Sequence, residues 1–326
     1  MKIVLFFPCI LIRVNGSLTP GEAGLRLWMP WLTFRSCGNQ TNQRSVEVDT
    51  DLEGQKEGKA EALQIASRAF FNHILIFPAP HWAPHLPVQH LSEARMHGWI
   101  IPPRKAPTKS REELEKERLA KVQWLLRHGY LKSGRIREAL LKVHREDFIP
   151  PQYRDYAYLE VPLPLPGSEA TISCPHSYPL FYEPLGLDQG HRFLEIGLGS
   201  GYGTALAREV VGPEGFVVSV EIDPQTFAFG KENLERAGYR DIVLIQGDGG
   251  LGYPEMSPYD RIAVTAACPK IPPPLIDQLR MGGRLVAPVI EDDVQNLVLA
   301  EKSETGTVRQ IICEVRYIPL KGIYGG

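Results

Sequence analysis

The chain has 326 residues, of which 43% are hydrophobic, so it can form one large domain or two ordinary ones with buried cores. Its 36 basic and 38 acidic side chains nearly cancel, which gives no general attraction to nucleic acid or anionic membranes, although a local patch is not excluded. The five cysteines are widely spread and lack a C-x-x-C pair, which argues against a disulfide framework or a zinc site. We therefore expect reduced thiols, and no metal, in a cytoplasmic protein.

An apolar run over residues 3–12 follows Lys2 and has the length of the apolar part of a signal peptide. It is too short to span a bilayer as a helix. Pro8 interrupts the run and Arg13 follows it directly. Residues 14–17 offer no evident small-residue cleavage site. Secretion is therefore the weaker alternative to a cytoplasmic location.

Residues 18–105 show little sustained periodicity, and prolines interrupt them repeatedly between Pro78 and Pro103. Two explanations stay open: an appended small module, or a start codon placed too far upstream, with Met96 as the true start. We favour the second. The predicted division is 1–105 for a poorly patterned or disordered extension and 106–326 for the main domain, with a helical cap and substrate loop at 106–189 and an α/β core at 190–326.

The pattern becomes helical at Ser110, which forms a capping box with Glu113. Apolar residues then recur on one helical face at Leu119, Val122 and Leu126. After a second helix, the prolines between 150 and 166 predict an extended passage rich in loops. The apolar face of that second helix carries Ile136, Leu140 and Val143.

From residue 190, strand-like and helix-like segments alternate, which predicts a parallel sheet covered by helices on both faces. Asp223 and Pro224 supply the N-cap and first position of one helix. The predicted fold class is α/β, a doubly wound, mostly parallel and Rossmann-like sheet behind an N-terminal helical cap. The strands are expected at 193–196, 216–221, 242–246, 261–265 and 284–289, and the helices at 202–211, from 224 to Gly238, and around 275–279.

A glycine-rich turn, E-I-G-x-G-S-G at 195–201, separates the first strand and helix of this core. Gly197, Gly199 and Gly201 let the backbone turn tightly and let a ligand approach the main chain. Glu221 ends the next strand about 20 residues later, where its carboxylate can accept hydrogen bonds from ribose hydroxyls. A dinucleotide is an alternative ligand, but the turn lacks the G-x-G-x-x-G spacing that places a pyrophosphate on a helix N-terminus. The pattern favours a nucleoside without phosphates.

These segments resemble class I methyltransferases, which use S-adenosylmethionine, at 195–201, at V-E-I-D 220–223 and at G-D-G 247–249. The resemblance implies that the loop glycines face the methionine part of the cofactor, that Glu221 holds the ribose and that Asp248 holds the adenine amino group. The next residue after Glu221 would pack on the adenine face, with a plain core position as the alternative. The cofactor-binding residues implied are Gly197, Gly199, Gly201, Glu221, Ile222, Asp248 and Gly249.

From about Ser110 onward, roughly two thirds of the chain resembles the protein-L-isoaspartate O-methyltransferase family. The resemblance implies methyl transfer to the free α-carboxylate of L-isoaspartyl residues in damaged proteins or peptides, which starts repair through a methyl ester and a succinimide. The segments that carry it are R-E-D-F-I-P-P at 145–151, A-T-I-S-C-P-H at 170–176, V-T-A-A-C-P-K-I-P at 264–272, Q-L-x-x-G-G-R-L at 278–285 and V-R-Y-I-P-L at 315–320.

The same resemblance places the hydroxyl of Ser173 at the substrate carboxylate, as the catalytic residue. Cys174 stands where the family often has Ala or Gln, and we interpret it as a small side chain filling its niche, because direct methyl transfer needs no covalent intermediate. A structural role stays open for the histidine of this segment, and simple strand termination for residues 265–266. The substrate-binding residues implied are His176, Thr265, Ala266 and Ile318.

Two other functions stay open. Residues 211–221 are also similar to tRNA adenine methyltransferases, but these usually carry an acidic residue after the fourth strand, and residues 265–269 have none. The second is a non-catalytic cofactor-binding module. The presence of suitable residues at all expected site positions argues against it. We expect a monomer that acts on isoaspartate-containing proteins or peptides, with no nucleic acid or membrane partner.

Overall fold

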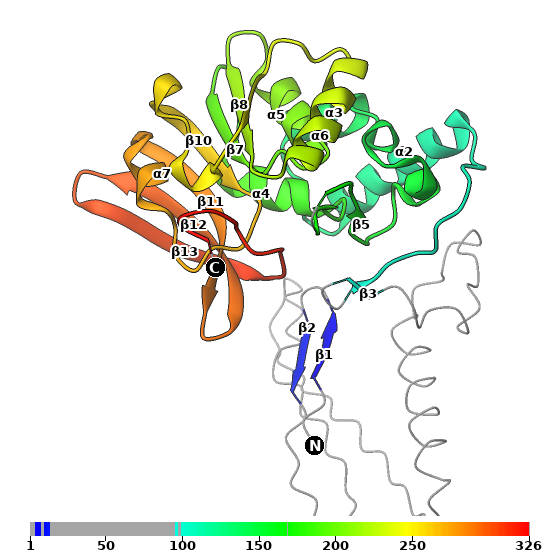
Figure 1. Cartoon of the computed structure of the whole chain (residues 1–326), viewed down its shortest axis with the longest axis horizontal. Coiled ribbons are helices and arrows are strands. Elements are labelled where there is room, and N and C mark those ends of the chain that lie inside the picture. The colour runs from blue at the N-terminus through cyan, green and yellow to red at the C-terminus, as the bar shows by residue number, and fades with distance from the viewer. Residues whose placement is uncertain (1–3, 8–9, 14–94, 97–98, 168, 326) are drawn as a thin grey trace, which may run out of the picture. The chain divides into compact units, whose positions relative to one another are not determined.

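The computed structural model describes residues 4–7, 10–13, 95–96, 99–167 and 169–325 (Figure 1). The chain forms two compact units, Met1–Val88 and Gln89–Gly326. In the first unit the described residues form an antiparallel pair of strands, β1 (Val4–Phe7) and β2 (Ile10–Arg13). Most of the predicted extension lies outside the described residues. Among those described, no helix has the length and apolar character needed to cross a membrane.

In the second unit, a short pair of strands, β3 (Arg95–Met96) and β4 (Trp99–Ile100), precedes helix α2 (Arg111–Arg127). The predicted capping box is confirmed, because Glu113 N–H donates to Ser110 Oγ at 3.2 Å and Ser110 N–H donates to Glu113 Oε2 at 2.7 Å. The predicted apolar face is partly wrong, since Leu119 and Leu126 are 45% and 39% exposed. The buried face consists of Leu114, Arg118, Val122 and Leu125.

The buried face of α2 is rotated relative to the predicted apolar face, because it includes Arg118. Its guanidinium Nη1 lies 3.5 Å from Glu146 Oε1, and this ion pair offsets part of the cost of burying the charge. Apolar periodicity cannot show that a charged residue belongs to the core face. Helix α3 (Gly134–Lys142) follows, and its predicted apolar face of Ile136, Leu140 and Val143 is buried.

The proline-rich passage is more regular than the sequence predicts. A 3₁₀ helix, η2 (Arg145–Phe148), precedes it, and a second one, η3 (Pro151–Tyr156), and an antiparallel strand pair follow. Helix α4 was not predicted, because Pro179 and Pro184 within it hide the helical pattern. The strand pair is β5 (Leu163–Pro164) and β6 (Thr171–Ile172), and α4 spans Ser177–Leu185.

A seven-stranded sheet has the order β13-β12-β11-β10-β7-β8-β9. Its five strands from β11 to β9 run parallel to their neighbours, which confirms the predicted α/β fold. The antiparallel strands β12 and β13 were not predicted. The bounds are β7 (Arg192–Ile196), β8 (Phe216–Glu221), β9 (Val243–Gln246), β10 (Tyr259–Val264), β11 (Leu279–Glu291), β12 (Val294–Ser303) and β13 (Gly306–Val315).

Helices cover both faces of the sheet: Figure 1 shows α4, α5 and α6 on one side and α7 on the other. Since successive residues of a strand point to opposite faces, Phe193 joins the core beneath α4 and α5, whereas Leu194 and Ile196 join the core that contains Leu275 of α7. The sheet is therefore doubly wound, as predicted. The remaining elements are α5 (Tyr202–Val211), α6 (Pro224–Arg236), η4 (Gly249–Leu251), η5 (Pro254–Met256) and α7 (Pro273–Asp277).

Candidate active site at the carboxyl ends of the strands

The carboxyl ends of four parallel strands meet at one edge of the sheet. Ile196 of β7 lies beside both Val220 of β8 and Val264 of β10, and Glu221 lies beside Gln246 of β9. The segments that follow these residues therefore emerge side by side, which is where open α/β sheets bind ligands. They are the glycine loop 197–201, residues 222–223, residues 247–249 and residues 265–267.

The glycine loop has a backbone shape that other residues resist. Gly197, Gly199 and Gly201 have φ values of 100°, 55° and 82°. A Cβ atom added at Gly197 would lie only 2.3 Å from Thr265 Oγ1, and one added at Gly201 would lie 2.9 Å from the backbone oxygen of Gly230. The loop therefore packs closely on its neighbours and presents bare main chain to a ligand. It carries no basic side chain, as suits a ligand without phosphates.

Glu221 is held beside this loop by two backbone donors. Gly199 N–H donates to its Oε2 at 3.0 Å, and Asp223 N–H donates to its Oε1 at 3.1 Å. Burial raises the pKa of Glu221, while these backbone donors act in the opposite direction. Because a carboxylate offers about four acceptor sites, its oxygens can also accept from two ribose hydroxyls. Ile222 is 36% exposed, so it lies at the surface, where a ligand ring can contact it.

Asp248 is oriented by both of its carboxylate oxygens. Gly250 N–H donates to Oδ1 at 2.9 Å, and Ile323 N–H, near the C-terminus, donates to Oδ2 at 2.7 Å. The sequence gives no sign of the second contact, which joins residues far apart in the chain. A Cβ atom added at Gly249 would lie 2.4 Å from Ile196 Cγ2, so the main chain beside Asp248 must be bare.

Ser173 lies between β6 and α4, and Arg145 fixes its main chain. Arg145 Nη2–H donates to Ser173 O at 2.6 Å, and Nε–H donates to Ala157 O at 2.6 Å. Its guanidinium carbon lies 5.7 Å from the ring centre of Tyr178 and 5.3 Å from that of Tyr202, which begins α5 directly after the glycine loop. Arg145 therefore ties the Ser173 segment to the cofactor side. Sequence patterns missed this role, because they do not show that a motif arginine is buried.

His176 is paired with Glu160, an acidic residue that no local sequence pattern marks. Its Nδ1 lies 2.6 Å from Glu160 Oε2, while Lys121 Nζ lies 2.9 Å from Glu160 Oε1. The ring of Tyr130 lies against the imidazole, with centroids 5.2 Å apart. Cys174 lies in the same turn, and burial raises the pKa of its thiol to about 12. A protonated thiol is a poor nucleophile, which agrees with its interpretation as a small packed side chain.

Thr265 braces the glycine loop. Its Oγ1 lies 2.9 Å from Ile196 O and 3.1 Å from Gly197 O, and its backbone N–H also donates to Ile196 O. These contacts occupy both hydrogen-bond donors of Thr265.

The segment 317–320 pairs with the residues that follow β10. Ala267 N–H donates to Ile318 O at 2.8 Å, and Leu320 N–H donates to Ala267 O at 2.7 Å. This pairing brings together two predicted substrate residues, Ala266 and Ile318, from segments about fifty positions apart. Their side-chain chemistry is apolar, so any polar contact with a substrate backbone has to come from the main chain.

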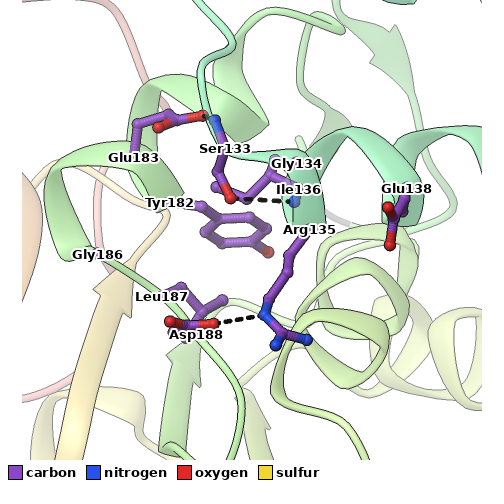
Figure 2. Close-up of a pocket in the computed structure, with 10 residues that line it drawn as sticks. All are labelled: Ser133, Gly134, Arg135, Ile136, Glu138, Tyr182, Glu183, Gly186, Leu187 and Asp188. Atoms are coloured by element: carbon purple, nitrogen blue, oxygen red, sulfur yellow. Dashed lines mark hydrogen bonds and ion pairs between the residues drawn. The ribbon is translucent and has the colours of Figure 1, made fainter.

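A separate surface cavity of about 550 Å³ lies between the start of α3 and the end of α4 (Figure 2). Arg135 Nε and Asp188 Oδ1 form an ion pair of 2.7 Å on its wall, and the ring of Tyr182 also lines it. None of the predicted site residues lines this cavity. This cavity is therefore separate from the candidate site at the strand ends.

The residues at the strand ends fit S-adenosylmethionine. The bare backbone of the glycine loop can admit its amino-acid part, and the carboxylates of Glu221 and Asp248 can accept hydrogen bonds from its ribose and adenine. No described residue of the loop supplies the positive charge that a pyrophosphate would favour. The donor set therefore matches a nucleoside cofactor.

Comparison with known proteins agrees with this geometry. Residues 115–324 match the family described as Protein-L-isoaspartate(D-aspartate) O-methyltransferase (PCMT). A protein-L-isoaspartate O-methyltransferase from Staphylothermus marinus is 45% identical over 222 residues, which are 66% of this chain and 98% of the relative. One from Hyperthermus butylicus is 42% identical over 227 residues, which are 67% of this chain and 94% of the relative.

Solved structures share the fold. A protein-L-isoaspartate O-methyltransferase has a TM-score of 0.60 at 36% identity, covering 64% of this chain and 67% of that chain. A second structure, described as a beta-aspartate methyltransferase (PCMT) from Plasmodium falciparum in complex with S-adenosyl-L-homocysteine, has a TM-score of 0.57 at 24% identity. It covers 62% of this chain and 97% of that chain, and it supports the fold alone.

Proposed function

This chain belongs to the protein-L-isoaspartate(D-aspartate) O-methyltransferase family, and we propose that its strand-end site methylates the free α-carboxylate of L-isoaspartyl residues in damaged proteins or peptides. The enzyme uses S-adenosylmethionine as methyl donor. The observation that carries the residue assignment is the meeting of the glycine loop, Glu221 and Asp248 at one sheet edge, with Arg145 joining Ser173 to it. The family match does not favour the tRNA adenine methyltransferase alternative.

The cofactor side of the site is built from main chain and two carboxylates. When bound, S-adenosylmethionine supplies an electrophilic methyl group on a sulfonium sulfur. Glu221 would accept hydrogen bonds from the ribose hydroxyls, and Asp248, oriented by its two backbone donors, would accept from the adenine amino group. Gly197, Gly199 and Gly201 would line the methionine part of the cofactor, and Ile222 and Gly249 would contact its adenine ring.

The acceptor side of the site works by positioning. An α-carboxyl group titrates at about 3.3 to 3.7, so the isoaspartyl carboxylate is already ionised near neutral pH and needs no strong general base. Ser173 Oγ–H donates to one carboxylate oxygen and thereby aims the other at the methyl group. Arg145 keeps the Ser173 main chain in place through its carbonyl oxygen. The residues that flank the substrate are His176, Thr265, Ala266 and Ile318.

We expect Glu221→Ala and Asp248→Ala each to weaken S-adenosylmethionine binding by about 1 to 3 kcal/mol, because a cofactor donor loses a charged acceptor. Isothermal titration calorimetry with the full chain measures this directly. Glu301→Ala is the control, since Glu301 lies on β12 and pairs with Arg284 at 2.9 Å. Unchanged affinity in both site variants would contradict the assignment.

The solution state proposed is a cytoplasmic monomer that binds no nucleic acid. A formal net charge of −2 supports the last point, because nucleic-acid affinity depends chiefly on basic side chains that neutralise phosphates.

We propose that residues 106–326 form the methyltransferase domain and that 1–105 are an extension, whose residues Ile101 and Lys105 pack on that domain. A chain starting at Met96 should fold and keep full turnover, because it retains buried Ile101 and the Lys105–Asp155 ion pair of 3.0 Å. A matched chain starting at Arg111 loses both contacts and the Ser110 cap. Its free energy of unfolding should fall by at least about 2 kcal/mol, from the lost burial and the lost cap. Urea unfolding and turnover assays compare the two, and loss of turnover in the longer one would show that the extension is required.

A further inference from the structure

Three side chains with metal-binding chemistry converge beside Ser173. A carboxylate oxygen of Glu160, the thiol sulfur of Cys174 and an imidazole nitrogen of His176 all lie within 4.8 Å of one another. Their spacing in the sequence gives no zinc signature, because Glu160 reaches the other two only through the fold. We propose that Glu160, Cys174 and His176 bind one zinc ion and that this ion blocks methyl transfer.

Two separate parts of the fold supply the three ligands. Glu160 lies between η3 and β5, Cys174 lies between β6 and α4, and His176 is the N-cap of α4. Cys174 is 5% exposed, whereas the His176 and Glu160 side chains are 12% and 24% exposed. A cation can therefore enter past the carboxylate and the imidazole, with the thiol at the closed end.

The donor set selects zinc over hard cations. Thiolate and imidazole ligands favour zinc, whereas magnesium and calcium prefer oxygen donors alone. Zinc bonds of about 2.0 to 2.3 Å place tetrahedral donors roughly 3.3 to 3.7 Å apart. The observed 4.8 Å limit must therefore shrink by about 1 Å, and the 2.6 Å contact between His176 Nδ1 and Glu160 Oε2 must widen by a similar amount. Side-chain rotations can supply both changes.

The charges at the site allow a neutral metal complex. Burial and the nearby Glu160 carboxylate raise the pKa of the Cys174 thiol, but a coordinating zinc ion removes the proton outright and releases it to the buffer. The thiolate and carboxylate then balance the two positive charges of zinc, and the imidazole binds as a neutral ligand. Lys121 contacts the other oxygen of Glu160, so Oε2 can serve the metal while that ion pair remains.

Blocking follows from the position of the ion, and this part rests on the proposed role of Ser173. Three protein ligands leave one zinc position open, and a carboxylate is a good ligand for it. A substrate carboxylate bound to zinc shares its lone pairs with the cation and leaves its alignment with the methyl group. The ligands at 174 and 176 also fix the turn that carries Ser173.

The site is tested on the full chain after removal of metal with a chelator, without substrate. Zinc is counted by equilibrium dialysis, and Co²⁺ serves as the optical probe, since a thiolate ligand adds a charge-transfer band in the near ultraviolet. Cys174→Ser should lose one bound zinc and the cobalt band, and His176→Gln should weaken zinc binding at least tenfold. Cys313→Ser is the matched control and should keep both signals, because Cys313 lies on β13 outside the cluster.

Equal zinc content and an equal cobalt band in the wild type and in Cys174→Ser would overturn the site. If Cys174→Ser does not fold, Glu160→Gln and His176→Gln decide in its place. For the blocking step, one equivalent of zinc should reduce methylation of an isoaspartyl peptide at least tenfold, and EDTA should restore it. Undiminished turnover of the zinc-loaded wild type would overturn that step. A metal-free enzyme without turnover would instead contradict the proposed function, and the binding result would still stand.

Discussion

Replacing Ser173 by alanine is expected to lower kcat by about ten- to a thousandfold while leaving the affinity for S-adenosylmethionine nearly unchanged. This range corresponds to about 1.4 to 4 kcal/mol, the effect of one hydrogen bond that positions a reacting group. The loss should appear in kcat because the carboxylate nucleophile keeps its charge but loses its alignment. Single-turnover methylation of an isoaspartyl peptide, together with calorimetry of cofactor binding, separates these two quantities.

The same geometry predicts a strong preference between two peptides. An isoaspartyl peptide should be methylated, and its normal aspartyl twin almost not at all. The normal peptide lacks the extra backbone methylene of isoaspartate and carries its free carboxylate on a side-chain methylene, which places that carboxylate out of line with the methyl group. Ser257→Ala is a suitable control for Ser173→Ala, since the exposed hydroxyl of Ser257 only donates to Pro254 O at 2.9 Å. Full activity in Ser173→Ala, or equal methylation of both peptides, would contradict the positioning role of Ser173.

Replacing Glu195 by glutamine is expected to remove a pH dependence of stability worth about 3 kcal/mol. Glu195 is 2% exposed on β7, and burial raises its pKa to about 7 from about 4.5, although Thr204 and Ser219 donate to its Oε2. The folded state therefore binds this proton more tightly than the unfolded state. The stabilisation that protonated Glu195 gives the folded state is complete below about pH 4.5 and is lost as the pH rises to about 7.

Urea unfolding of the cofactor-free chain from pH 4.5 to 8 measures this effect. Relative to the wild type, Glu195→Gln should become more stable as the pH rises, by about 3 kcal/mol across the range. The comparison between pH values cancels any constant cost of fitting the amide between Thr204 and Ser219. Glu301→Gln is the control, because its carboxylate is 43% exposed and paired on the surface. Parallel stability curves for the wild type and Glu195→Gln would show that Glu195 is ionised throughout.

Short-range signals explain why much of the fold could be predicted. The Ser110 capping box, the Asp223 cap of α6 and the strand β8 depend on residues close together in the sequence, and the structure has all three as predicted. In α4 and in the turn between β11 and β12, which the sequence did not predict, the local residues favour other structures. Helix α4 contains two prolines, and the turn from β11 to β12 uses Asp292 and Asp293, both at positive φ, without a glycine to mark it.

The sequence by itself determined the parallel sheet, the glycine loop with its acidic partners, and the family resemblance, because each depends on local spacing along the chain. Only the tertiary structure decided which groups meet. Arg145 with the Ser173 carbonyl, Asp248 with Ile323, and Glu160 with His176 are pairs separated along the chain but joined by hydrogen bonds. Such pairs leave no periodic pattern, since the partners are brought together by the packing of whole elements rather than by their spacing along the chain.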